Sequence, residues 1–182
     1  METRLHRETI RGAARTAHDL ALAALIGGNL FGRLAMHPAL TDVSDQSERG
    51  RVLNRAWRRY GTVNSLALLT LVSGWLGERR QESRPRRWWE IRSKRPARET
   101  SRYRDAAMGA VLITGLASAL SGVGFSQQAP KGAVPMRSGR TPSPEASKRA
   151  AALKKAVNTL SALNLASELV LVAMDSATDG RT

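Results

Sequence analysis

Hydrophobic residues are concentrated in four stretches of the chain, and nearly all of the charged residues lie between them. The stretches cover residues 18–36, 62–77, 106–125 and 156–174. Each is close to the roughly 20 residues that a helix needs to cross a bilayer core, with the second one short. The third, "AAMGAVLITGLASALSGVGF", has no charge, whereas a soluble four-helix protein carries a polar, usually charged face along each helix. The pattern predicts an all-α fold, a four-helix transmembrane bundle in a single domain, and a soluble bundle is the alternative.

The first connector, residues 37–61, contains a shorter amphipathic pattern. One helical face of residues 51–60 is apolar while the rest is rich in Arg, and its apolar positions are Val52, Leu53, Ala56, Trp57 and Tyr60. Trp and Tyr beside a span are typical of the membrane interface. We therefore expect an additional short amphipathic interfacial helix, although a solvated helix packed on the bundle fits the pattern equally well.

The other two connectors differ sharply in composition. Residues 78–105 contain eleven Lys and Arg, and clustered bases beside a span attract anionic lipid headgroups. We predict a basic cytoplasmic loop that binds anionic lipid through Arg84, Arg86, Arg87, Trp88, Trp89, Lys94 and Arg95. A nucleic-acid arm with stacking Trp is the less favoured alternative, because the segment has no base-reading motif. Residues 126–147, rich in Pro, Ser and Gly, are expected to be disordered or loosely extended.

Composition and charge narrow the possible chemistry. The chain has 29 Lys and Arg against 15 Asp and Glu, a net charge of +14, which predicts attraction to anionic surfaces. It has no Cys and only three His, so disulfides and Cys nucleophiles are excluded, and we expect no metal site and no cofactor. Because bases are densest in the second connector, the positive-inside rule predicts a multi-pass protein of the cell membrane with both termini in the cytoplasm.

Polar residues inside the spans gather on one side of their helices. On a helical wheel, those of the first span fall within an arc of about 100° and are His18, Asp19, Asn29 and Arg33. The fourth span has a similar arc of Ser161, Asn164 and Glu168. Since these two spans run antiparallel, we expect two polar clusters between them. The outer one is a polar seam of Asn29, Arg33, His37, Asn64 and Asn158, and the inner one, our candidate catalytic group, is His18, Asp19 and Glu168.

These clusters have a functional and a structural interpretation. A pocket with His and carboxylate groups could transfer protons or hold a small polar headgroup. The same groups could instead hydrogen-bond between helices, with Arg33 reaching the interface. Gly28 with Gly32, and Gly115 with Ala119, are spaced for close helix packing, either within the chain or in a homo-oligomer.

Two segments of the first half resemble a known group of membrane proteins. "GGNLFGRLAMHPAL" and "NRAWRRYGTVN" resemble the small four-span bacterial membrane proteins grouped as anthrone-oxygenase-like and, more loosely, those of the DoxX type. The resemblance covers about the first 65 residues and implies a four-helix membrane fold. Some members of that group are linked to the oxidation of aromatic substrates without a known cofactor. The long basic second connector departs from the family pattern, and no catalytic residue is carried over.

Three functions follow from these patterns. We favour an integral membrane protein that acts as a non-enzymatic component and binds anionic lipid or a partner protein. The alternative is a membrane-embedded enzyme or carrier that acts on a small apolar substrate through the His18, Asp19 and Glu168 group. The third is a soluble basic helical bundle that binds nucleic acid.

Overall fold

The computed structural model describes residues 2–82, 95–129 and 133–179, and this part of the chain is helical. Most of the described residues are helical, and no strand is present in these ranges. Four of the helices are long: α1 (Glu2–Phe31), α3 (Gln46–Glu82), α5 (Arg95–Ser126) and α6 (Lys148–Asp179). The all-α prediction is therefore confirmed.

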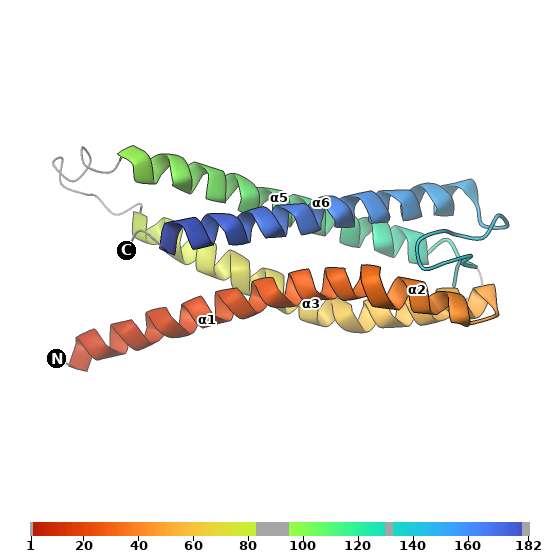
Figure 1. Ribbon diagram of the computed structural model, residues 1–182, viewed down its shortest axis with the longest axis horizontal. Helices are drawn as coiled ribbons and strands as arrows, with labels where there is room; N and C mark the ends of the chain where they lie inside the picture. Colours follow the sequence, from red (N-terminus) through yellow and green to blue (C-terminus); the bar gives the residue numbers. More distant parts are fainter. Residues whose placement is uncertain (1, 83–94, 130–132, 180–182) are drawn as a thin grey trace.

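The four long helices alternate in direction, so that both termini lie at one end of the molecule (Figure 1). Helix α5 packs along α6 and α1 packs along α3, while α1 also contacts α6 more sparsely. The short helices that follow α1 and the segment before α6 lie together at the opposite end (Figure 1). The protein thus consists of two helix pairs with a looser seam between them.

Helix α1 does not end at its apolar stretch but continues around Pro38. A π-helical turn (Gly32–Met36) leads into the single turn α2 (His37–Ala39) and a 3-10 turn (Leu40–Asp42). Proline lacks an N–H and its ring collides with the carbonyl four residues earlier, and the wider turn relieves both problems. The N–H of His37 bonds to the oxygen of Gly32 across this turn. The chain therefore stays helical and holds His37 at the end of the bundle.

Helix α3 runs unbroken through a region where a separate element was expected. The predicted short interfacial helix over residues 51–60 is wrong as a separate element, because these residues lie within the first half of the continuous helix α3. No proline interrupts the sequence between Gln46 and Glu82, and Gly61, which directly follows the predicted short helix, costs only about 1 kcal/mol in a helix interior. The range predicted as a basic loop, residues 78–105, is partly helical, since α3 extends to Glu82 and α5 begins at Arg95.

Two glycines let α1 and α3 approach closely. The ring of Tyr60 lies against Gly28 so tightly that a Cβ atom there would overlap it, and the Tyr60 hydroxyl donates to the backbone oxygen of Ala24. Trp57 lies against Gly32, where a Cβ atom would come within 2.8 Å of the indole ring. The predicted pair Gly28 and Gly32 therefore serves close packing of α1 on α3 within the chain.

The buried apolar residues form two separate cores. The core on the side of the termini joins all four long helices and contains Ala21, Leu22, Leu25, Ala67, Leu71, Ala107, Met108, Val111 and Leu171. The core at the other end contains Leu40, Leu53, Phe125, Val134, Met136 and Ala150. The region between them holds the polar groups described below.

Residues 133–147 are folded onto the second core, in contrast to the disordered segment expected there. Met136 is fully buried and its N–H donates to the oxygen of Gln46 at 2.8 Å. Arg49 reaches across from α3 and donates to the oxygen of Arg137 at 2.6 Å. The composition of the segment suggested disorder, but its few apolar side chains have a core to enter and its backbone groups find partners on α3.

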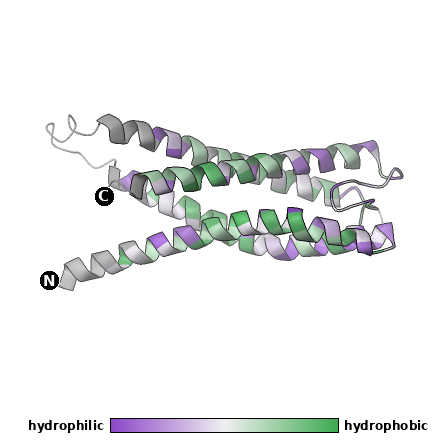
Figure 2. Ribbon diagram, viewed as in Figure 1, coloured by the Kyte–Doolittle hydropathy of each residue, from purple (hydrophilic) through white to green (hydrophobic). Residues whose placement is uncertain are grey.

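Large apolar side chains cover much of the outer surface of the helices. Leu34 is 75% exposed and Ile113 is 71% exposed, and hydrophobic residues are concentrated in the middle of the bundle, while its end opposite the termini is largely hydrophilic (Figure 2). Three helical segments of the described chain are long and apolar enough to cross a membrane: Gly12–Asp42, Arg102–Ser126 and Lys148–Ala177. Helix α3 does not reach the same apolarity. A membrane protein is thus supported, with three candidate spans.

Candidate functional site

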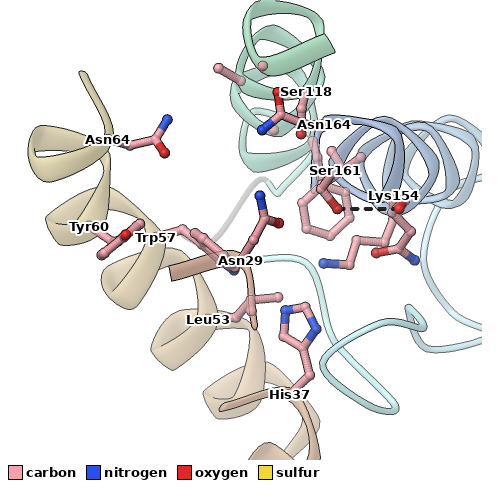
Figure 3. Close-up of a pocket in the computed structure, with 16 residues that line it drawn as sticks. Asn29, His37, Leu53, Trp57, Tyr60, Asn64, Ser118, Lys154, Ser161 and Asn164 are labelled. Atoms are coloured by element: carbon pink, nitrogen blue, oxygen red, sulfur yellow. Dashed lines mark hydrogen bonds between the residues drawn. The ribbon is translucent and has the colours of Figure 1, made fainter. Parts of the chain in front are cut away.

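A cavity of about 210 Å³ opens in the seam between the two helix pairs. Its walls come from all four long helices and from α2, as Figure 3 shows for the labelled side chains. The lining residues are Asn29, His37, Leu53, Trp57, Tyr60, Asn64, Gly115, Ser118, Ala119, Gly122, Phe125, Lys154, Val157, Asn158, Ser161 and Asn164. The lining combines apolar side chains with amide, hydroxyl and basic groups, which suits a ligand with both kinds of surface.

The sequence of α5 explains why this space is empty. Gly115, Ser118, Ala119 and Gly122 follow the spacing of one helical face, and all four line the cavity. Small side chains leave unfilled volume where a Leu on the same face would fill it. Close to the same face, a Cβ atom on Gly115 would lie 3.1 Å from the side-chain oxygen of Asn164, so α5 and α6 also approach closely there.

The predicted polar seam lies at this cavity. Asn29, His37, Asn64 and Asn158 line it. Arg33 lies beside it and donates to the hydroxyl of Ser161 at 2.7 Å and to the backbone oxygen of Asn158 at 3.3 Å. The structure therefore brings the five residues together, and Arg33 bonds across to α6.

Residues 133–147 lie next to one end of the cavity, where they contact two of its lining residues. The amide of Asn158 donates to the backbone oxygen of Arg140 at 2.9 Å. Gly139 lies against His37, where a Cβ atom would come within 2.6 Å of the His37 backbone. His37 in turn lies 6.1 Å from Trp57, measured between ring centroids. Residues far apart in the sequence thus converge at this end of the cavity.

Glu168 lies at the opposite side of the seam, deeper in the bundle. Its side chain is fully buried and one carboxylate oxygen accepts a hydrogen bond from the amide of Asn164. Asn164 itself accepts one from the hydroxyl of Thr114 at 2.9 Å, and Asn29 lies beside the carboxyl group. The other carboxylate oxygen, Oε2, is buried and accepts no hydrogen bond within the described part of the chain.

The predicted inner cluster is wrong in its membership. His18 pairs with Asp175 at 2.9 Å, and the Nε of Arg104 donates to the same carboxylate at 2.6 Å. Asp19 is exposed, and Glu168 is with the asparagines instead. Helices α1 and α6 are antiparallel, so a step toward the N-terminus on α1 matches a step toward the C-terminus on α6. Because Arg33 lies level with Ser161, His18 lies level with Asp175. Glu168 is about two helical turns short of that position.

Sequence reasoning missed two groups at these sites. Lys154 is only 3% exposed and lines the cavity. It lies two residues before the predicted fourth span, residues 156–174. Its signal was present, because Lys154, Asn158 and Ser161 follow the spacing of one helical face. Asp175 was overlooked because it follows the apolar stretch.

Other predicted residues lie outside the described part of the chain. Six of the seven residues assigned to the anionic-lipid loop are in the range 83–94, and they are Arg84, Arg86, Arg87, Trp88, Trp89 and Lys94. Arg95 begins α5, but its side chain is also outside the described residues. Across the described ranges, no group of three or more His, Cys, Asp or Glu residues is placed to hold a metal ion.

Comparison with known proteins identifies no relative, because no family model, no curated protein and no solved structure matches the chain. The resemblance to anthrone-oxygenase-like proteins therefore stays a prediction. The functional argument rests on the site itself.

Proposed function

We propose that this chain is a four-span integral membrane protein that acts as a non-enzymatic binding component, and that its cavity holds a lipid-like ligand. The observation that carries the proposal is the cavity itself, which is partly apolar, lies between the helix pairs and is surrounded by helices with apolar outer faces. Such a site takes ligands that partition into the bilayer.

The path of the chain supports a fourth span through α3. Helix α1 ends at one end of the bundle and α5 begins at the other (Figure 1), so the connecting helix must return along the same distance. Its 37 residues extend about 55 Å at 1.5 Å per residue, well beyond a hydrocarbon core of about 30 Å. Its exposed side includes Leu66 and Leu69. With both termini in the cytoplasm, the cavity end near residues 133–147 faces the outside.

The chain has no Cys, so single introduced cysteines test this topology without interference. Thr41→Cys and Arg80→Cys lie near the two ends of α3, at exposed positions. A membrane-impermeant maleimide added to intact cells should label Cys at 41 and leave Cys at 80 protected. Labelling of both positions, or of neither, would mean that α3 does not cross. Recovery of the protein in the soluble fraction without detergent would refute the membrane placement.

Ligand binding is tested with a matched pair of substitutions on α5. A Cβ atom has open space at both Gly122 and Gly109, but only Gly122 lines the cavity. The probe is a monoacylglycerol with a brominated chain, which is uncharged and quenches Trp fluorescence on contact with Trp57. Gly122→Leu should fill the cavity and abolish saturable quenching, while Gly109→Leu keeps it. Equal quenching in both variants would place the probe elsewhere and refute the proposal.

A second candidate function is a carrier or enzyme that uses the buried carboxylate. Glu168 favours it, because Oε2 accepts no hydrogen bond from the described residues, and Asn29 both lines the cavity and lies beside this carboxyl group. Ionisable groups at such depth are costly and are often functional. Glu168→Gln preserves the size and the hydrogen bond to Asn164. Unchanged ligand binding and unchanged stability in this variant would assign Glu168 a packing role only.

A further inference from the structure

We propose that the cavity end next to residues 133–147 recognises an anionic group, a carboxylate or phosphate carried by an amphiphile whose apolar part lies along the rest of the cavity. This inference rests on the proposed function and names the class of ligand. It is argued from charges that the fold gathers without a counter-charge.

Lys154 is the central group of this site. Its side chain is 3% exposed and extends from α6 into the cavity toward His37 and Asn29 (Figure 3). Its ammonium nitrogen lies 5.6 Å from the centroid of the Phe125 ring. No carboxylate of the described residues forms an ion pair with it. A buried lysine without a partner is costly unless another group supplies the negative charge.

Two arginines add to the positive charge at the same place. Arg140, from the folded segment, lies close enough to repel Lys154, and both act on His37 together with Arg33. The described ion pairs all lie at the other end of the bundle, around Asp105 and Asp175. Arg140 is exposed, but the burial of Lys154 reduces the solvent screening of the repulsion between the two charges. A bound anion is the arrangement that turns this repulsion into attraction.

Unused hydrogen-bonding groups point to the same conclusion. Both ring nitrogens of His37 and the Nε of Arg33 are buried and have no hydrogen-bond partner in the described ranges. Most buried polar atoms in native proteins are paired, so these atoms indicate a missing partner. An oxyanion accepts hydrogen bonds from several donors at once, and arginine and lysine are its usual donors.

The apolar remainder of the cavity decides between a free ion and an amphiphile. Leu53, Trp57 and Phe125 line the cavity beside the cationic end. Free phosphate would leave these walls uncovered, whereas a carboxylate or phosphate on a hydrocarbon chain would cover them. The structure therefore favours a fatty acid or a phosphorylated lipid over inorganic phosphate.

The experiment compares an anionic and a neutral probe of the same chain length. The brominated fatty acid and the brominated monoacylglycerol are titrated against the full-length protein in neutral detergent, with Trp fluorescence as the readout. Lys154→Met removes the charge from the cavity, and Lys155→Met, at an exposed neighbour, is the matched control. Lys154→Arg retains the charge and tests whether loss of binding reflects loss of charge.

The fatty acid should bind more tightly than the monoacylglycerol. Lys154→Met should weaken the fatty acid about thirtyfold or more, the loss typical of removing one partner of a buried charge pair, and leave the neutral probe unchanged. Lys155→Met and Lys154→Arg should preserve the preference. Full displacement of the fatty acid by inorganic phosphate would identify the free ion as the ligand and overturn the amphiphile.

The two proposals fail in different ways. Equal affinity for both probes in the unaltered protein, with Gly122→Leu still abolishing binding, would refute the anion site and leave the cavity function standing. Saturable quenching that Gly122→Leu does not affect would refute the cavity function. Equal weakening of both probes by Lys154→Met and Lys154→Arg would show that Lys154 only supports the fold.

Discussion

The packing of Tyr60 on Gly28 provides a sharp test of how α1 and α3 meet. A methyl group on Gly28 would overlap the Tyr60 ring, whereas a Cβ atom on the adjacent Gly27 meets open space. Gly28→Ala and Gly27→Ala therefore place the same side chain on the same helix, and only the first encounters a neighbour.

The expected difference can be worked out from these contacts. Both substitutions gain the same helix propensity, about 1 kcal/mol for Ala over Gly, so this contribution cancels between them. Gly28→Ala also forces the Tyr60 ring to move, an overpacking cost of about 1–3 kcal/mol. It breaks the hydrogen bond from Tyr60 to Ala24 as well, worth about 1 kcal/mol. Gly28→Ala should therefore lower the free energy of unfolding by about 2–4 kcal/mol relative to Gly27→Ala.

Thermal unfolding in mild detergent measures this difference. Trp fluorescence is a suitable readout because Trp57 lies 6.1 Å from Tyr60 between ring centroids. At about 2–4 °C per kcal/mol for a chain of this size, the melting temperatures should differ by roughly 5–15 °C. In a Tyr60→Ala background the two glycine variants should melt together. Equal melting temperatures in the native background would refute the described packing of α1 on α3.

Two further predictions concern the end of the bundle near the termini. Asp175→Asn removes the negative charge that accepts hydrogen bonds from His18 and from an arginine on α5, so it should lower the free energy of unfolding by about 1–3 kcal/mol. The control, Asp19→Asn at an exposed position, should change it by less than about 0.5 kcal/mol. Equal melting temperatures of the two variants would contradict the pairing. Leu71→Ala should cost about 2–5 kcal/mol because Leu71 is fully buried in the core, and Leu69→Ala, at 62% exposure, should cost far less in denaturant unfolding. A similar loss in both would contradict the assignment of the core face of α3.

Local patterns in the sequence were sufficient to predict the helices and the polar seam. Hydrophobic stretches and helical spacing depend only on residues a few positions apart, so the four long helices were foreseen. The polar arcs of the two helices and their opposite directions were sufficient to place Arg33 and Asn158 in one cluster, and Arg33 donates to the backbone oxygen of Asn158. Trp57 and Tyr60 were expected on an apolar face, and they pack against α1.

Other features depended on register and on contacts between distant segments. His18 pairs with Asp175 rather than Glu168. A helical wheel gives the direction in which a side chain points but not its height along the neighbouring helix, and that height depends on how the two helices are aligned over their whole length. The segment over residues 133–147 is folded because Met136 enters a core built by other elements.

The amino-acid pattern alone predicted that the chain is helical, that it has long apolar stretches suited to a membrane, and that polar groups share a seam; three of the four predicted spans correspond to helical segments that are long and apolar enough to cross one. Only the tertiary structure decided that this seam contains a cavity, and that Lys154, His37 and Arg140 meet at one end of it. Each of these groups alone fits an ordinary helix end or connector. Their significance comes from their proximity, because the interaction of the buried Lys154 charge with neighbouring groups depends on the distances between them.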